Sequence, residues 1–301
     1  GSHVSLSAAG ITDGRNIRVA EEIDRLIGDT RTQRVIRDGT PRYWRRCGGY
    51  NLDRLLPDGP RNLAHLVCGS EGTLAVMTEI TLDLVPRPSH AALGLVHFDD
   101  LYLALAAVPA ILETSPSAVE LLDTLSLTLC REVPTYARLL ESVVDGRPHS
   151  LLIVEFQGES DVEVSDGIER LEKRLAQERL GMTGLTRALT PEAMGAVWQV
   201  RKAGLGLLMS MKGDMKPMPF IEDAAVPVEH LPDYVRQIEE YCAGFGTPVT
   251  YSAHAGAGCL HIRPLINRRH AAEVVKSFGG ALSSEHGDGR TRGWLNEAFY
   301  G

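Results

Sequence analysis

Two histidines that flank a glycine-bearing turn are the strongest chemical signal in this sequence. Residues 252–263 read SAHAGAGCLHIR, so Gly256 and Gly258 lie between His254 and His261. If the glycines close an antiparallel hairpin that places the histidines opposite each other, their Cβ atoms are ~4.5–5.5 Å apart. Two imidazoles at that spacing can bind one metal ion at ~2.0–2.1 Å each. A hydrogen-bonded histidine pair without a metal is the alternative.

A carboxylate and a third histidine follow in residues 284–289, which read SEHGDG. Adjacent residues point apart in a regular strand, but Gly287 and Gly289 favour a loop in which Glu285 and His286 can reach one centre. We expect Glu285 to be the third metal ligand and His286 a general base, because imidazole titrates near neutral pH. Two histidines and one carboxylate leave open positions on the ion, as in catalytic sites. A solvent-facing pair that caps a helix is the alternative.

Two further features could bind ligands. Arg201, Lys216 and Arg263 could bind a substrate carboxylate, and Arg263 has the same strand facing as His261. A solvated surface beside a methionine-rich patch is the alternative for Arg201 and Lys216. Residues 68–73 (CGSEGT) form a glycine-bearing turn whose backbone could approach a ligand closely, although an ordinary turn is the simpler interpretation.

The elements that must position these residues alternate between strands and helices. Apolar positions at helical spacing occur in residues 17–38, and period-two alternation predicts a strand at 74–85, ended by prolines at 86 and 88. We place a domain boundary there. The following pattern, with an antiparallel hairpin, predicts an α+β fold with helices on one face of the sheet. The expected strands are 91–98, 118–122, 151–157, 219–226, 248–254 and 258–264, and the expected helices include 100–113, 162–180, 191–202, 228–244 and 268–278.

Composition narrows the class of protein. The 301 residues carry a net charge of -8, which argues against a nucleic-acid-binding face. No apolar run approaches the ~18–20 residues of a membrane span. Five widely spaced cysteines predict free thiols in a reducing compartment. We therefore expect a cytoplasmic protein, with peripheral attachment to a membrane left open. Residues 1–3 (GSH) look like the remnant of a cleaved tag.

Three motifs in order resemble the FAD-linked oxidases of the vanillyl-alcohol-oxidase-like superfamily, in the branch of D-lactate and D-2-hydroxyglutarate dehydrogenases and the glycolate oxidase subunit. Residues 69–74 are similar to the family's flavin-contacting loop, residues 254–261 to its metal hairpin, and residues 284–289 to its active-site loop. The stretches 48–53 (GGYNLD) and 220–227 (FIEDAAVP) are most similar to large bacterial members that carry a fused iron–sulfur segment.

The resemblance implies that residues 4–88 are the last part of an FAD-binding domain and residues 89–301 a substrate-binding cap domain, truncated at its C-terminus. It implies a divalent metal, zinc or manganese, on His254, His261 and Glu285. His286 would take the proton of the substrate's α-hydroxyl while hydride passes to the flavin. Substrate carboxylates would be bound by Arg201 and Arg263, and by Lys216 in place of a basic residue that the family carries nearby. Flavin contacts would come from Gly69, Ser70, Glu71, Gly72 and Thr73.

Departures from the family pattern also matter. The hairpin has Ala257-Gly258-Cys259 where the family has Asp-Gly-Asn, which removes a polar contact. The first FAD half-domain is missing, so this piece should bind FAD weakly or not at all. The expected partners are a 2-hydroxy acid, a downstream electron carrier and the missing FAD half-domain. Two alternatives remain open: a metal-dependent hydrolase that uses a metal-bound water, and a non-catalytic module derived from the oxidase.

Overall fold

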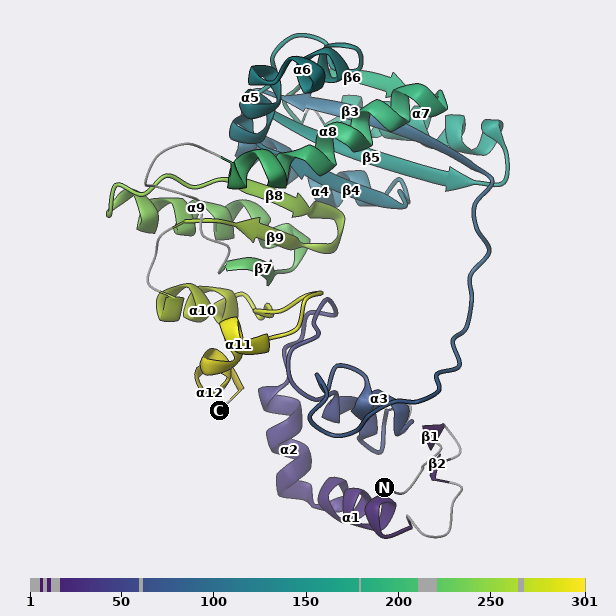
Figure 1. The fold of residues 1–301 in the computed structure, drawn as a ribbon, viewed down its shortest axis with the longest axis vertical. Helices are drawn as coiled ribbons and strands as arrows, with labels where there is room; N and C mark the ends of the chain where they lie inside the picture. Colours follow the sequence, from purple (N-terminus) through teal and green to yellow (C-terminus); the bar gives the residue numbers. More distant parts are fainter. Residues whose placement is uncertain are drawn as a thin grey trace.

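The computed structural model describes residues 6–7, 10–11, 17–59, 62–178, 180–210, 221–264 and 268–300. A seven-stranded antiparallel sheet dominates these residues, with the strand order β6-β3-β5-β4-β8-β9-β7 (Figure 1). Its strands are β3 (His90–Phe98), β4 (Ala118–Leu122), β5 (Ser150–Gly158), β6 (Met182–Ala188), β7 (Ile221–Ala225), β8 (Tyr251–His254) and β9 (Cys259–Ile262). The prediction of an α+β fold with an antiparallel sheet is confirmed, although β6 had not been predicted.

Helices cover both faces of this sheet, so the expectation of helices on one face is wrong. Alternate residues of β3 and β5 enter two different apolar clusters. One cluster contains α4 (Leu101–Leu112), α7 (Asp161–Glu178), α9 (Leu231–Ala243) and α10 (Arg268–Ser277). The other contains α5 (Thr124–Glu132), α6 (Pro134–Glu141) and α8 (Pro191–Met209). The sequence signal for a doubly covered sheet is the near-continuous apolar run of β3 and β5, which lack the alternation of a half-exposed strand and are almost entirely buried.

The N-terminal part is helical and small. Two residues form each of β1 (Leu6–Ser7) and β2 (Gly10–Ile11), and the helices are α1 (Ile17–Gly28), α2 (Thr30–Gly39), η1 (Leu52–Leu55) and α3 (Ala64–Val67). The predicted helical pattern over 17–38 is broken at Asp29, whose carboxylate accepts the Thr32 backbone N–H at 2.7 Å and caps α2. A small apolar cluster holds this part together around Ile27, Ile36, Leu55 and Leu56.

The predicted strand at 74–85 is wrong. The segment is extended but belongs to no sheet, and its apolar side chains face solvent, with Val76 and Leu84 each 89% exposed. Figure 1 shows it as the long connection from α3 to β3. A segment with period-two alternation forms a β-ladder only when a neighbouring strand pairs with it. None of the described segments pairs with residues 74–85. The two-domain division at residue 88 therefore remains a proposal.

The C-terminal elements lie beside the N-terminal part, although they are far away in sequence (Figure 1). They comprise α11 (Gly289–Arg292), η4 (Gly293–Leu295) and α12 (Asn296–Tyr300). The Tyr300 hydroxyl donates to the Gly48 carbonyl at 3.2 Å, and the Cys47 backbone N–H donates to the Ser283 carbonyl at 2.9 Å. Cys47 and Gly48 thus contact the C-terminal segment at Ser283 and Tyr300. Among the described helices, none has the length and apolar character needed to cross a membrane.

Candidate active site

The hairpin of β8 and β9 carries both histidines on one face of the sheet. His254 pairs with Cys259, and His261 pairs with Ser252. The predicted register, which placed His254 opposite His261, is therefore wrong. Because Cys259 and His261 lie two positions apart on one strand, they face the same side, and the two histidines are diagonal neighbours. Their ring centroids are 5.0 Å apart and the ring planes meet at 86°.

The turn explains the register. Residues Ala255–Ala257 form a short 3-10 turn (η3), and Gly258 closes it in the left-handed region with φ 64°. A Cβ at this position would lie 2.0 Å from the Val226 carbonyl oxygen, so a side chain does not fit. Glycine at 258 fixes where the turn ends. This sets the pair His254–Cys259 as the last one of the ladder.

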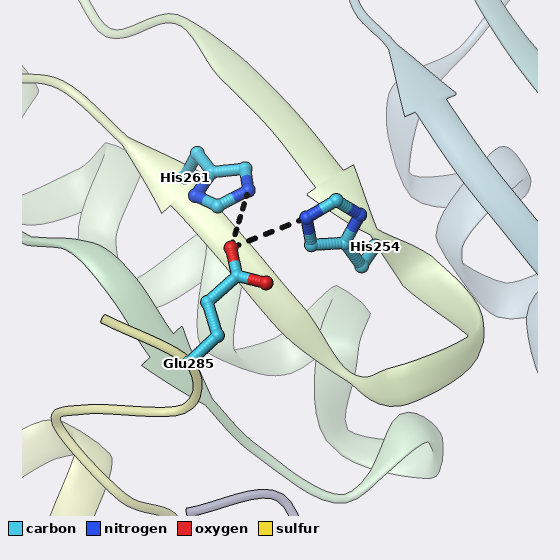
Figure 2. Close-up of side chains that lie close together, drawn as sticks. All are labelled: His254, His261 and Glu285. Carbon is cyan, nitrogen blue, oxygen red and sulfur yellow. Dashed lines mark ion pairs between the residues drawn. The ribbon is translucent and has the colours of Figure 1, made fainter. Parts of the chain in front are cut away.

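Glu285 points at the two imidazoles from the loop that follows Ser284 (Figure 2). Its Oε1 lies 3.3 Å from His254 Nε2 and 3.8 Å from His261 Nε2. The candidate ligand atoms of the three residues lie within 4.8 Å of one another. His261 is buried, whereas Glu285 is exposed, so the cluster sits at the edge of the core and faces outward.

His286 joins the same cluster. Its Nε2 lies 3.2 Å from Glu285 Oε1, and its ring is parallel to that of His261, with centroids 6.1 Å apart and planes at 14°. Its side chain is 45% exposed, so a small molecule can reach it. The structure therefore brings His254, His261, Glu285 and His286 together, and their chemical roles remain predictions.

A fully buried carboxylate, Asp223 in β7, holds the loop of Glu285 and His286. Its oxygens accept the Ser283 hydroxyl at 3.1 Å and the Ser284 hydroxyl at 2.5 Å. They also accept the backbone N–H groups of Glu285 at 3.3 Å and His286 at 3.0 Å. Four donors on one carboxylate offset the cost of burying its charge. Asp223 had not been predicted to have a role, and its position inside the FIEDAAVP stretch was the available signal.

Arg201 reaches the cluster indirectly, through Glu120. The Glu120 carboxylate lies 2.7 Å from His254 Nδ1 and 2.9 Å from Arg201 Nη2. The hydrogen bond with Glu120 raises the pKa of His254 above its usual value, against the effect of burial. A carboxylate on Nδ1 favours the tautomer that carries the proton there, which leaves Nε2 as the ring atom that can bind a metal.

The other two predicted substrate-binding residues, Arg263 and Lys216, differ in what the structure describes of them. Arg263 follows β9, is buried, and donates its backbone N–H to the Thr250 carbonyl at 3.3 Å. Lys216 lies outside the described residues. Arg45 had not been predicted, yet its Nη2 lies 3.2 Å from Glu285 Oε2. Its only sequence signal was its place in a basic pair just before the GGYNLD stretch.

The predicted flavin-contacting turn, residues 69–73, lies against the active-site loop. Gly69, Glu71 and Gly72 all have positive φ. The Glu71 carboxylate accepts the backbone N–H groups of Asp288 at 2.8 Å and Gly289 at 3.0 Å. Ser70 is buried, and its carbonyl accepts the Thr73 hydroxyl at 2.6 Å. Flavin binding by these residues remains a prediction.

The donor set fits a divalent metal. Two imidazole Nε2 atoms and one carboxylate oxygen are the ligand types that zinc and manganese accept, and three protein ligands leave a position open for substrate. Burial raises the pKa of the nearby Cys259 thiol to about 12. The sulfur of Cys259 lies 2.8 Å from the Ser284 hydroxyl.

Residues 87–300 match the family described as FAD linked oxidases, C-terminal domain. The match covers more than half of the chain, so the chain belongs to this family. The class indicated by the sequence motifs is thereby confirmed.

Individual relatives narrow the comparison. The chain is 31% identical over 289 residues to the D-2-hydroxyglutarate dehydrogenase of Pantoea ananatis. This alignment covers 89% of this chain and 28% of that protein. It is 31% identical over 291 residues to the enzyme of the same name from Escherichia coli, with the same coverage. The glycolate oxidase subunit GlcD of Bacillus subtilis is 26% identical, over 77% of this chain and 50% of that protein. The chain thus spans about a quarter to a half of the length of these relatives.

Among solved structures, alkyldihydroxyacetonephosphate synthase aligns with a TM-score of 0.47 and 18% identity, over 79% of this chain and 47% of that chain.

Proposed function

We propose that this chain is the metal- and substrate-binding part of an FAD-dependent dehydrogenase that oxidises a D-2-hydroxy acid to the 2-oxo acid. One observation carries the proposal: the side chains of His254, His261 and Glu285 converge on one point beside His286. Membership of the FAD-linked oxidase family supports an oxidation in which FAD is the cofactor.

Each residue then has a defined task. His254, His261 and Glu285 would hold a zinc or manganese ion, which supplies Lewis acidity toward the substrate's oxygens. His286 would accept the proton of the α-hydroxyl, since its ring lies within hydrogen-bond reach of the same centre. Flavin bound by the whole protein would supply the acceptor for the hydride that leaves Cα. Asp223 and Glu120 keep the base and one ligand in place.

The substrate class follows from charge and from the relatives. Arg201 and Arg263, with Lys216, would bind carboxylates, and more than one cation favours a dicarboxylate such as D-2-hydroxyglutarate over D-lactate. Relatives with the name D-2-hydroxyglutarate dehydrogenase support this choice. In the whole protein, the first FAD half-domain and a downstream electron carrier would complete the enzyme, which we propose acts in the cytoplasm or peripherally at a membrane.

Calorimetric titration of the purified chain with Zn²⁺ or Mn²⁺ tests the metal site. We expect one ion per chain, with binding lost in His254→Ala and His261→Ala and strongly weakened in Glu285→Gln. The control is His90→Ala, because His90 is paired with Asp161 at the far end of β3. Unaltered binding in both hairpin variants, or no binding by the unmodified chain, would contradict the proposal.

Dye reduction by the full-length protein with FAD tests the reaction. D-2-Hydroxyglutarate should reduce the dye faster than D-lactate, and His286→Ala should abolish reduction with either acid. Ester hydrolysis that requires the metal but no flavin would instead favour the hydrolase. Absence of any turnover by the flavin-loaded protein would favour the non-catalytic module.

A further inference from the structure

We propose that Arg45 is a positioning residue for the metal ligand Glu285: it occupies Oε2 and thereby leaves Oε1 as the single ligand atom. The inference rests on the metal site of the proposed function and adds a determinant of its ion selectivity.

The two oxygens of Glu285 face different partners. Oε1 is the atom directed at the imidazoles, 3.3 Å from His254 Nε2 and 3.2 Å from His286 Nε2. Oε2 points the other way and lies 3.2 Å from Arg45 Nη2. The guanidinium of Arg45 donates to Oε2 and so fixes the plane of the carboxylate. Oε2 therefore cannot turn toward the ion without breaking this hydrogen bond.

Arg45 is itself held in place from two sides. Two residues before Arg45, the Tyr43 hydroxyl donates to the Ala257 carbonyl at 2.9 Å, which ties the segment to the histidine hairpin. Two residues after Arg45, the Cys47 sulfur accepts the Gly287 backbone N–H at 3.1 Å. The guanidinium also lies over the Trp44 ring, with 5.7 Å from Cζ to the centroid. The segment is therefore fixed to the same hairpin and loop that carry the ligands.

A comparable support exists for His254, a candidate ligand that is half-buried. His254 is held by Glu120, which is itself paired with Arg201. Outer partners of this kind orient ligand atoms, and their loss typically weakens metal binding by about 10–100-fold.

Arg45 precedes the matched family domain, which begins at residue 87. The N-terminal part thus contributes to a site whose ligands all belong to the C-terminal domain.

Ion selectivity follows from one-oxygen ligation. Calcium favours several oxygen ligands and often a bidentate carboxylate, whereas zinc accepts a single carboxylate oxygen with two imidazoles. With Arg45 present, the carboxylate is held in the form that suits zinc. Without it, Glu285 is free to offer both oxygens, so zinc binding weakens while calcium binding does not.

Calorimetric titrations of the 301-residue chain with Zn²⁺ and with Ca²⁺ test the inference. Arg45→Met should weaken Zn²⁺ binding by about 10–100-fold and leave Ca²⁺ binding equal or stronger. Arg45→Lys keeps a cation without the planar fork and should fall between. Arg37→Met is the control, since Arg37 pairs with Asp58 in the same part of the chain. Circular dichroism checks that each variant is folded.

The outcomes separate the two proposals. Failure of the unmodified chain to bind Zn²⁺ would reject the metal site and, with it, the role of Arg45. Normal binding by the unmodified chain, with Arg45→Met and Arg45→Lys unchanged, would reject the role of Arg45 alone. An equal loss for Zn²⁺ and Ca²⁺ would also reject it, because a general structural defect does not alter the ratio between the ions.

Discussion

The carboxylate of Glu71 accepts the backbone N–H of Asp288 at 2.8 Å, across 217 positions of sequence. A second bond, from the Gly289 N–H at 3.0 Å, makes the contact bidentate. The turn at residues 69–73 therefore holds the loop that begins at His286. Glu71, which resembles a flavin contact in sequence, thus holds the backbone of the active-site loop in the structure.

Glu71→Gln removes the negative charge from this contact. We expect the free energy of unfolding to fall by about 1–2 kcal/mol, because hydrogen bonds to a charged acceptor are stronger than those to an amide. Hydrogen exchange at the amides of Asp288 and Gly289 should accelerate. Glu79→Gln, in the exposed connection before β3, is the control. Equal exchange rates in the two variants would show that the contact does not hold the loop.

Asp223→Asn should be among the most damaging conservative changes in the chain. The asparagine side chain has one acceptor oxygen, whereas Asp223 accepts two hydroxyls and two backbone N–H groups while fully buried. Each buried donor left without an acceptor costs about 1–3 kcal/mol, so we expect a loss of about 3 kcal/mol or more. Urea unfolding measures it. Asp233→Asn, at an exposed pair with Arg236, should change stability little; a similar loss in both would contradict this assignment.

Two glycines with similar positive φ values allow the cost of backbone strain to be measured apart from the cost of a steric clash. Gly146 (φ 70°) has open space around an added Cβ, so Gly146→Ala should cost only the left-handed strain of about 1–2 kcal/mol. Gly258 (φ 64°) would place its Cβ 2.0 Å from the Val226 carbonyl oxygen and 2.6 Å from the Tyr43 hydroxyl. Gly258→Ala should therefore lose clearly more stability in thermal unfolding. Equal losses would mean that the turn can shift to admit a methyl group.

His97 should make stability depend on pH. Burial lowers the pKa of His97 below its usual value of about 6.5, and the charge of Asp145 only partly opposes this. Below about pH 6.5 the unfolded chain binds a proton that the folded chain does not, so the free energy of unfolding decreases as pH falls toward the folded-state pKa.

His97→Gln should remove that contribution, and the two proteins should differ in their pH slope between about pH 7.5 and 5.5 in urea unfolding. The Thr186 hydroxyl lies 3.2 Å from His97 Nε2, and the glutamine amide of the variant would remain a polar neighbour for it. Parallel slopes would exclude His97 as the titrating group.

Local periodicity was sufficient to predict most of the sheet and its helices. The 118–122 strand matches β4 residue for residue, and the predicted 162–180 helix begins one residue after α7 begins and ends two residues after α7 ends. Failures occurred where structure depends on distant partners. The alternation at 74–85 indicates which side chains share a face, but it cannot supply the neighbouring strand that would make a ladder.

The grouping of the candidate site residues was predictable, but the residues that support them were not. His254, His261, Glu285 and His286 occur in two short motifs, so their grouping could be expected from sequence. The register error arose because the position of the turn depends on the fit of Gly258 against Val226, which is a tertiary contact. Asp223, Glu120 and Arg45 come from three separate segments, and no local pattern links them to the histidines.

The exposed connection at residues 74–85 has one further consequence. It is the covalent path between the segment that carries Arg45 and Glu71 and the sheet that carries the histidines. Exposed chain without ladder hydrogen bonds is the preferred substrate of proteases. After a single cleavage there, only noncovalent contacts would keep Arg45, the proposed outer partner of Glu285, in place, so we expect a nicked preparation to release the Arg45 segment upon dilution.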